Sequence, residues 1–143
     1  MSGPAVTQAL QATLSAEYAA IFGYGVAGAH LAGTQFAAAQ RDWAAHEAAR
    51  DTVTALLAAH GAQPAAAAAA YGLPFPVHNG REAMALAAFL EDRVAAAYLS
   101  LVALDDPQLR AFGATGLQAA ATRAAGWRGT TLAFPGLEVA PTP

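Results

Sequence analysis

The chain has 143 residues, of which 56% are hydrophobic and only 12% are charged. This length is typical of one domain, here 1–143, and the apolar content excludes a solvated disordered chain. The absence of Cys excludes disulfides, thiolate metal sites and cysteine nucleophiles. A net charge of −3 argues against nucleic acid as a partner, because phosphate binding requires a cationic face.

The first two predicted elements are long helices. The first is expected at about 5–32, where Gly33 interrupts it. The second is expected at about 35–60, after Thr34 as a plausible N-cap, and Gly61 stands where a helix commonly ends in the left-handed conformation. Both segments carry apolar residues three and four apart, the spacing of a buried helical stripe.

A long connection separates the second predicted helix from the third. Residues 61–79 contain three prolines, at 64, 74 and 76. A connection of this length is uncommon unless it has a structural or functional role. Extended, it is long enough to run back along a helix. We therefore expect a crossover that returns the chain to the other end of a bundle.

The last two predicted helices have clear start signals. The third, at about 80–104, follows Asn79, with Glu82 three residues later in capping-box spacing. The fourth, at about 107–128, follows Asp106 as N-cap and has Pro107 at its first position. A Pro-rich tail, 129–143, completes the chain. The sequence thus predicts an all-α four-helix bundle with a long crossover between the second and third helices.

A polar residue interrupts the apolar stripe of every predicted helix. Because an isolated charge inside an apolar core costs several kcal/mol, these residues are expected to meet and compensate one another. The predicted central cluster, in chain order, is Glu17, His46, Arg50, Glu91 and Arg123. Its possible neighbours are the aromatic residues Tyr24, Trp43 and Tyr98.

Two readings of this cluster compete. A di-iron or di-manganese bundle needs carboxylates on two helices and Glu-x-x-His on the other two. Here the residue three before His46 is Trp43, and the segment 107–128 contains no Asp, Glu or His. We therefore favour a cluster without a metal cofactor, in which Arg50 and Arg123 replace the cations. The alternative is one Fe, Mn or Zn ion held by Glu17, His46 and Glu91.

Other polar and small residues receive simpler interpretations. Asp42 lies four residues before His46, and we interpret it as part of a solvated helical face. Gly23, Gly25 and Gly28 form a ridge that allows another helix to approach closely, from the same chain or from a second subunit. Together with the high apolar fraction, the ridge predicts a homo-oligomer, most simply a dimer.

The beginning of the chain predicts the location. Met1-Ser2-Gly3-Pro4 lacks the basic region and apolar run of a secretory signal. The longest apolar stretches are Ala-rich and interrupted by polar residues, which argues against a membrane span. We expect a cytoplasmic protein without a membrane partner.

Several short segments together resemble a bacterial family of alanine-rich, ferritin-like proteins of unknown function, from about Leu10 to Leu137. These segments are Ala16-Glu17-Tyr18-Ala19-Ala20, Tyr24-Gly25, His46-x3-Arg50-Asp51, Leu73-Pro74-Phe75-Pro76-Val77, Leu90-Glu91, Ala97-Tyr98 and Arg123-x3-Trp127. The resemblance implies a ferritin-like four-helix bundle with a long crossover. It implies no ferroxidase activity, because the Glu-x-x-His motifs are missing.

These observations lead to three functional hypotheses. The first is a non-catalytic structural or interaction protein whose metal site has been replaced by salt bridges. The second is a metal-binding protein that performs redox or oxygen chemistry with a single ion. The third is a small-ligand-binding bundle with a cavity lined by Tyr24, Trp43 and Tyr98.

Overall fold

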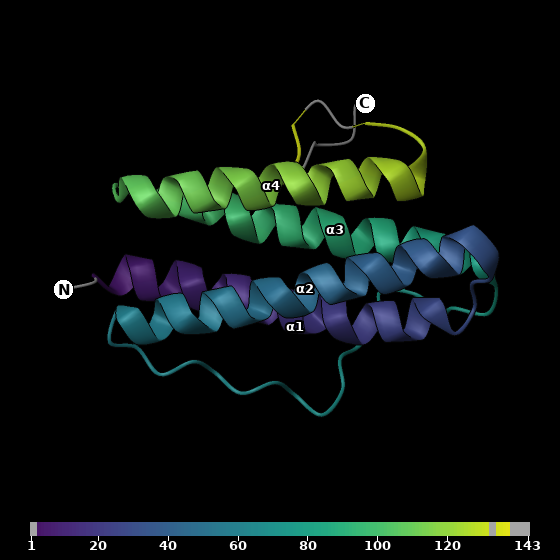
Figure 1. The fold of residues 1–143 in the computed structure, drawn as a ribbon, viewed down its shortest axis with the longest axis horizontal. Helices are drawn as coiled ribbons and strands as arrows, with labels where there is room; N and C mark the ends of the chain where they lie inside the picture. Colours follow the sequence, from purple (N-terminus) through teal and green to yellow (C-terminus); the bar gives the residue numbers. More distant parts are fainter. Residues whose placement is uncertain (1–2, 132–133, 138–143) are drawn as a thin grey trace.

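The computed structural model describes residues 3–131 and 134–137 and contains four long helices (Figure 1). They are α1 (Pro4–Gly28), α2 (Gly33–Ala59), α3 (Gly80–Val102) and α4 (Pro107–Arg128). No strand occurs within these two described ranges. The all-α, four-helix fold class is therefore confirmed. No helix among the described residues is long and apolar enough to cross a membrane.

The caps of α3 and α4 form as the sequence predicts. The Asn79 side chain accepts a hydrogen bond from the backbone N–H of Glu82 at 2.9 Å. The Asp106 carboxylate accepts from the backbone N–H groups of Gln108 and Leu109, both at 2.9 Å. Helix α4 ends at Gly129, whose φ of 84° lies in the left-handed region that glycine readily adopts. These caps satisfy backbone groups that the helix itself leaves without partners.

The boundary between α1 and α2 differs from the prediction. Helix α1 ends at Gly28, four residues before the expected position, and α2 already begins at Gly33. The residue at the N-cap position is Ala32, which offers no capping side chain, and Thr34 lies inside the first turn. The reversal between the two helices uses Gly33 with a φ of 58°, a conformation that favours glycine.

The crossover runs from His60 to Asn79 along the outside of α1 and α2, and it reaches the end of the bundle where α3 begins (Figure 1). Its first half is attached to α1. Gln11 donates to the carbonyl of Gln63 at 2.7 Å and accepts from the N–H of Ala65 at 3.0 Å. The predicted long connection between the second and third helices is confirmed.

The described part of the tail lies against α3. A Cβ atom at Gly136 would come within 3.0 Å of the carbonyl oxygen of Ala95, so the backbones approach closely there. Of the predicted tail, 129–143, residues 132–133 and 138–143 lie outside the described residues.

The core has two apolar clusters, one towards each end of the bundle. Helix α3 packs on α1 and α4, and α1 also packs on α2. One cluster includes Leu14 of α1 and Leu57 of α2, while the other includes Ala27 of α1 and Leu86 of α3. The buried His46 and Glu91 lie between these two clusters along α2 and α3, and the buried Glu17 of α1 lies beside His46. The fold therefore places a layer of charge at the middle of an apolar bundle.

Candidate functional site

The imidazole of His46 lies between two buried carboxylates. Its Nδ1 is 2.6 Å from Oε2 of Glu17, and its Nε2 is 2.8 Å from Oε1 of Glu91. All three side chains have at most 1% of their surface exposed. A carboxylate accepts hydrogen bonds, so both ring nitrogens donate, and only a protonated histidine carries two ring N–H groups. The site therefore contains an imidazolium clamped from both sides.

The electrostatics of His46 agree with this protonation state. Burial by itself would lower the pKa of His46, because it penalises the charged form. The hydrogen bonds to Glu17 and Glu91, together with their negative charges, outweigh burial and raise the pKa to about 9. The ring is therefore positively charged at neutral pH.

Glu17, on α1, is held from both oxygens. Its Oε2 accepts from His46, and its Oε1 accepts from the hydroxyl of Tyr98 on α3 at 2.8 Å. Both oxygens of this buried carboxyl group therefore have a hydrogen-bond partner. Burial and the negative charge of Glu17 raise the pKa of Tyr98, which keeps its hydroxyl proton available for this bond. Tyr98 therefore contacts the cluster through Glu17.

Glu91, on α3, receives three hydrogen bonds on one oxygen. Its Oε1 accepts from His46, from the hydroxyl of Tyr24 at 2.7 Å and from Nε of Arg123 at 2.9 Å. Burial would raise the pKa of Glu91, but His46, Arg123 and Tyr24 together lower it. Among the described residues none donates to its buried Oε2. The carboxylate is thus ionised, and all of its hydrogen bonds from the described residues are made to Oε1.

Asp42 and Trp127 extend the network, and the sequence analysis placed Asp42 wrongly. The Trp127 indole N–H is shared between Oδ2 of Asp42, at 3.0 Å, and the oxygen of Tyr24, at 2.9 Å. Asp42 is 4% exposed and does not belong to a solvated face. The buried stripe of α2 follows Ala39, Asp42 and His46, steps of three and four that could have identified Asp42.

Two predicted members of the cluster lie elsewhere on α2. The Arg50 guanidinium reaches outwards, with Nε 2.9 Å from Asp51 and Nη1 3.8 Å from Glu47, and the prediction that it joins the cluster is wrong. Trp43 is 39% exposed and makes no hydrogen bond to the described network. It follows Asp42, and consecutive helical residues point about 100° apart, so the two cannot share the buried stripe.

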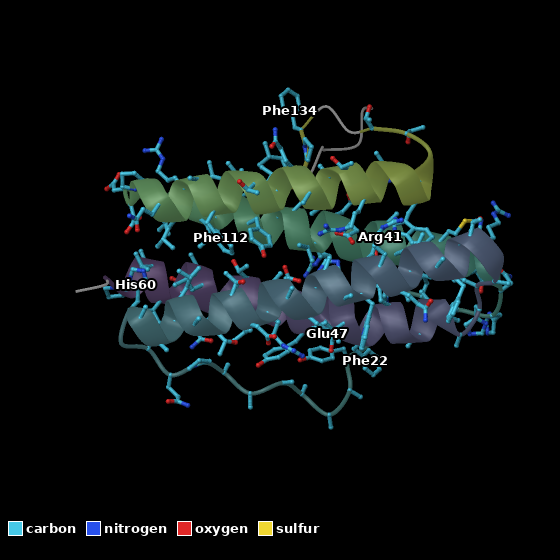
Figure 2. The ribbon with its side chains drawn as sticks, viewed as in Figure 1. Phe22, Arg41, Glu47, His60, Phe112 and Phe134 are labelled. Atoms are coloured by element: carbon cyan, nitrogen blue, oxygen red, sulfur yellow. The ribbon has the colours of Figure 1, made fainter. Side chains whose placement is uncertain are left out.

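Tyr24, Trp43 and Tyr98 were expected to line one ligand cavity, but only Tyr24 and Trp43 line the same one. Tyr24 and Trp43 line a cavity of about 280 Å³ between α1 and α2, beside Gly25 and Phe36. Tyr98 is not among its lining residues and packs on the other side of the charge layer, against Phe112. Figure 2 shows Phe112 pointing from α4 towards the other helices.

The geometry does not fit the single metal ion that was the alternative. Glu17 and Glu91 contact different nitrogens of one ring, and the directions of those two nitrogens diverge. A common ion would have to lie about 2.0–2.2 Å from ligand atoms of all three residues. Within the described part of the chain, no group of three His, Asp or Glu residues could hold a metal ion. Instead, the four charges Glu17, His46, Glu91 and Arg123 balance one another.

Comparisons with known proteins agree with the four-helix fold and leave the activity open. The family described as a domain of unknown function, DUF4439, matches residues 9–139. The chain is similar in structure to a conserved hypothetical protein, rv2844, from Mycobacterium tuberculosis. The TM-score is 0.86 with 31% sequence identity, over 90% of this chain and 98% of that one. The comparison with curated proteins gives no match.

Proposed function

This chain belongs to the DUF4439 family, and we propose that it is a non-catalytic, ferritin-like bundle in which a charge network takes the place of a di-metal centre. The observation that carries the proposal is the position of His46, whose two nitrogens both donate to carboxylates. A histidine in this state offers no lone pair to a metal ion.

The charge balance of the site supports the same proposal. Glu17 and Glu91 contribute two negative charges, and His46 and Arg123 contribute two positive charges. The further acid of the network, Asp42, has its own cationic partner in Arg41. A divalent ion would need His46 to lose its proton. At about 4 Å, Arg123 would also repel the ion by several kcal/mol, even at an effective dielectric constant near 20. His46 thus supplies the second positive charge that the sequence analysis assigned to Arg50.

The network has a structural role in this proposal, because each helix contributes at least one charged residue. Glu17, His46, Glu91 and Arg123 come from α1, α2, α3 and α4 in that order. A sliding of any helix would leave a charge buried without its partner, which costs about 3–5 kcal/mol. We infer that the cluster selects one register of the four helices, which the surrounding Ala-rich surfaces specify only weakly.

Metal analysis tests the proposal directly. Full-length protein is expressed with excess iron, manganese and zinc, dialysed and analysed for bound ions, beside the variants Glu17→Ala and Glu47→Ala. We expect far less than one ion per chain in all three proteins. The proposal is refuted by a stoichiometric ion that is lost in Glu17→Ala but kept in Glu47→Ala, which removes a half-buried carboxylate of α2 that lies outside the network.

Nuclear magnetic resonance of His46 provides a positive readout. In protein labelled with ¹⁵N at histidine, we expect both ring nitrogens of His46 to carry slowly exchanging protons at neutral pH. A neutral ring with a single N–H group would contradict the charge balance even if no metal is found.

The cytoplasmic location and the self-association remain predictions. The exposed Phe36 and Trp43 beside the open Gly25 give α1 and α2 an apolar face that favours association. Sedimentation at micromolar concentration is expected to detect a dimer, and a monomer alone would contradict the prediction.

A further inference from the structure

A second cavity lies between α2 and α4, on the outer side of the charge network. The closely packed helix pairs are α1 with α2, α1 with α3, and α3 with α4, so α2 and α4 leave space between them. This space is a cavity of about 330 Å³ with Asp42, Arg123 and Trp127 in its wall. It is therefore adjacent to the network and open to small molecules.

Two arginine residues line this cavity. Arg123, from α4, lines it with a side chain that is 22% exposed, and Arg41, from α2, lines it at the surface with 74% exposure. Figure 2 shows Arg41 on the side of α2 that faces α4. Proteins commonly bind oxyanions with Arg side chains, because a guanidinium donates two parallel hydrogen bonds to them.

Arg123 has donors to spare. A guanidinium carries five N–H groups, and Arg123 uses its Nε group for Glu91. Among the described residues no other acceptor takes a hydrogen bond from Arg123, and its terminal nitrogens are not buried without a partner. The planar edge that remains is a matching surface for a carboxylate, which accepts two parallel N–H groups.

The acidic residue in the wall, Asp42, already has a partner for each of its two carboxylate oxygens. Its Oδ2 accepts from the indole of Trp127, and its Oδ1 is 3.4 Å from Nε of Arg41. The exposed Arg41 side chain can pair with a bound anion while Asp42 keeps its bond to Trp127. The charged donors that remain for an anion entering near Arg123 are therefore those of the two arginines.

The rest of the wall mixes apolar or small residues with three uncharged polar ones, Thr34, Gln35 and Thr122. Ala38 comes from α2, Met84 from α3 and the ring of Trp127 from α4. At Gly126, a Cβ atom would meet nothing within 4 Å, so the space beside the ring is free. A ligand for this wall needs an apolar body of a few carbon atoms attached to its anionic group.

We propose that the cavity between α2 and α4 binds a small organic carboxylate. The carboxylate lies on Arg123 and Arg41, and its apolar body lies against Trp127 and Met84. This site is separate from the buried Glu17–His46–Glu91 clamp, and it does not depend on whether that clamp excludes metal ions.

Benzoate is a suitable probe, with benzyl alcohol as a neutral molecule of similar shape. Binding is followed by the indole N–H resonances of the two tryptophans in full-length protein. We expect benzoate to shift Trp127 saturably and to leave Trp43, which lines a different cavity, unchanged. We expect benzyl alcohol to bind at least about tenfold more weakly, because it cannot form charge-assisted hydrogen bonds. Equal binding of the two molecules, or no saturable shift, overturns the proposal.

Two pairs of matched variants locate the bound probe. Arg41→Gln removes the guanidinium at the rim and is expected to weaken benzoate binding about tenfold. Arg110→Gln removes the same charge from an exposed position on α4 outside the cavity and is expected to have no effect. An equal loss in both variants would mean that benzoate responds only to net charge, which contradicts the proposed site.

The second pair tests the cavity by filling it. Gly126→Leu places a side chain in the space beside Trp127, and Gly25→Leu does the same in the cavity between α1 and α2, where a Cβ also meets nothing. We expect Gly126→Leu to abolish saturable binding and Gly25→Leu to preserve it. The opposite result would place the ligand between α1 and α2 and overturn the proposal.

Discussion

His46 on α2 and Glu91 on α3 lie 45 residues apart in the sequence and form a 2.8 Å hydrogen bond in which both side chains are fully buried. The bond joins a positive and a negative group in a place that water does not reach. Such a pair stabilises the folded protein only while both partners keep their charge. When one partner loses its charge, the other is left buried and unpaired, which destabilises the fold. The first two predictions follow from this dependence.

The stability of the protein should fall as pH rises from neutrality. The pKa of His46 is raised from 6.5 to about 9 in the folded protein. A raised pKa means that the stabilisation is complete below 6.5 and is lost as pH passes through about 9. The shift corresponds to about 3 kcal/mol of unfolding free energy, because one pKa unit is worth about 1.4 kcal/mol.

Urea unfolding between pH 6 and pH 9.5 measures this loss, and the upper limit stays below the ordinary pKa of tyrosine. His46→Gln is the control, since it removes the titrating ring, and its stability should vary much less over the same range. A wild-type protein whose stability is constant over this range would show that His46 is not held as an imidazolium.

Removing the charge of Glu91 should be strongly destabilising. Glu91→Gln keeps the shape of the side chain and leaves His46 and Arg123 without their shared negative partner. We expect a loss of about 3–5 kcal/mol, the usual result of breaking a buried ion pair. Glu47→Gln removes a carboxylate that is 34% exposed and 3.8 Å from Arg50, and it should change stability by less than about 1 kcal/mol. Chemical denaturation of the two variants decides the point, and similar losses would contradict a buried charge network.

The indole N–H of Trp127 should matter more than the ring itself. Trp127→Phe keeps an aromatic ring but removes the 3.0 Å donor of Asp42 and leaves its Oδ2 only the 3.5 Å contact with the hydroxyl of Tyr24, which costs about 1–3 kcal/mol. Trp43→Phe is the matched change at a half-exposed position and should alter stability by about 0.5 kcal/mol or less. Thermal and urea unfolding measure both. If Trp43→Phe is the more damaging variant, Asp42 does not depend on Trp127.

A methyl group at Gly116 should disturb the network from a distance. A Cβ there would overlap the ring of Tyr98, whose hydroxyl donates to Glu17. We expect Gly116→Ala to cost about 1–3 kcal/mol, as overpacking does in a rigid core. Gly126→Ala, where a Cβ meets nothing, should instead stabilise α4 by about 0.5–1 kcal/mol. Opposite signs in calorimetry are the expected result, and a stabilising Gly116→Ala would mean that Tyr98 has room to move.

Much of this molecule could be predicted from local sequence. Asn79, Asp106 and Pro107 set the starts of α3 and α4 through short-range hydrogen bonds and backbone restriction, which need no distant partner. The polar interruptions at Glu17, His46 and Glu91 revealed a central cluster, because a charge in an apolar stripe requires compensation.

Only the tertiary structure decided how that compensation is achieved. Helical periodicity leaves the direction of a stripe uncertain by about one residue, or about 100° around the axis. An error of one residue is enough to exchange the buried Asp42 for the half-exposed Trp43 in the predicted stripe of α2. Arg50 pairs with Asp51, the next residue in the sequence, at the surface and does not reach the buried cluster. The charge of His46 could not be predicted from local sequence either. Whether its ring holds a second proton depends on Glu17 and Glu91, two acids from different helices that the fold brings to opposite sides of the ring.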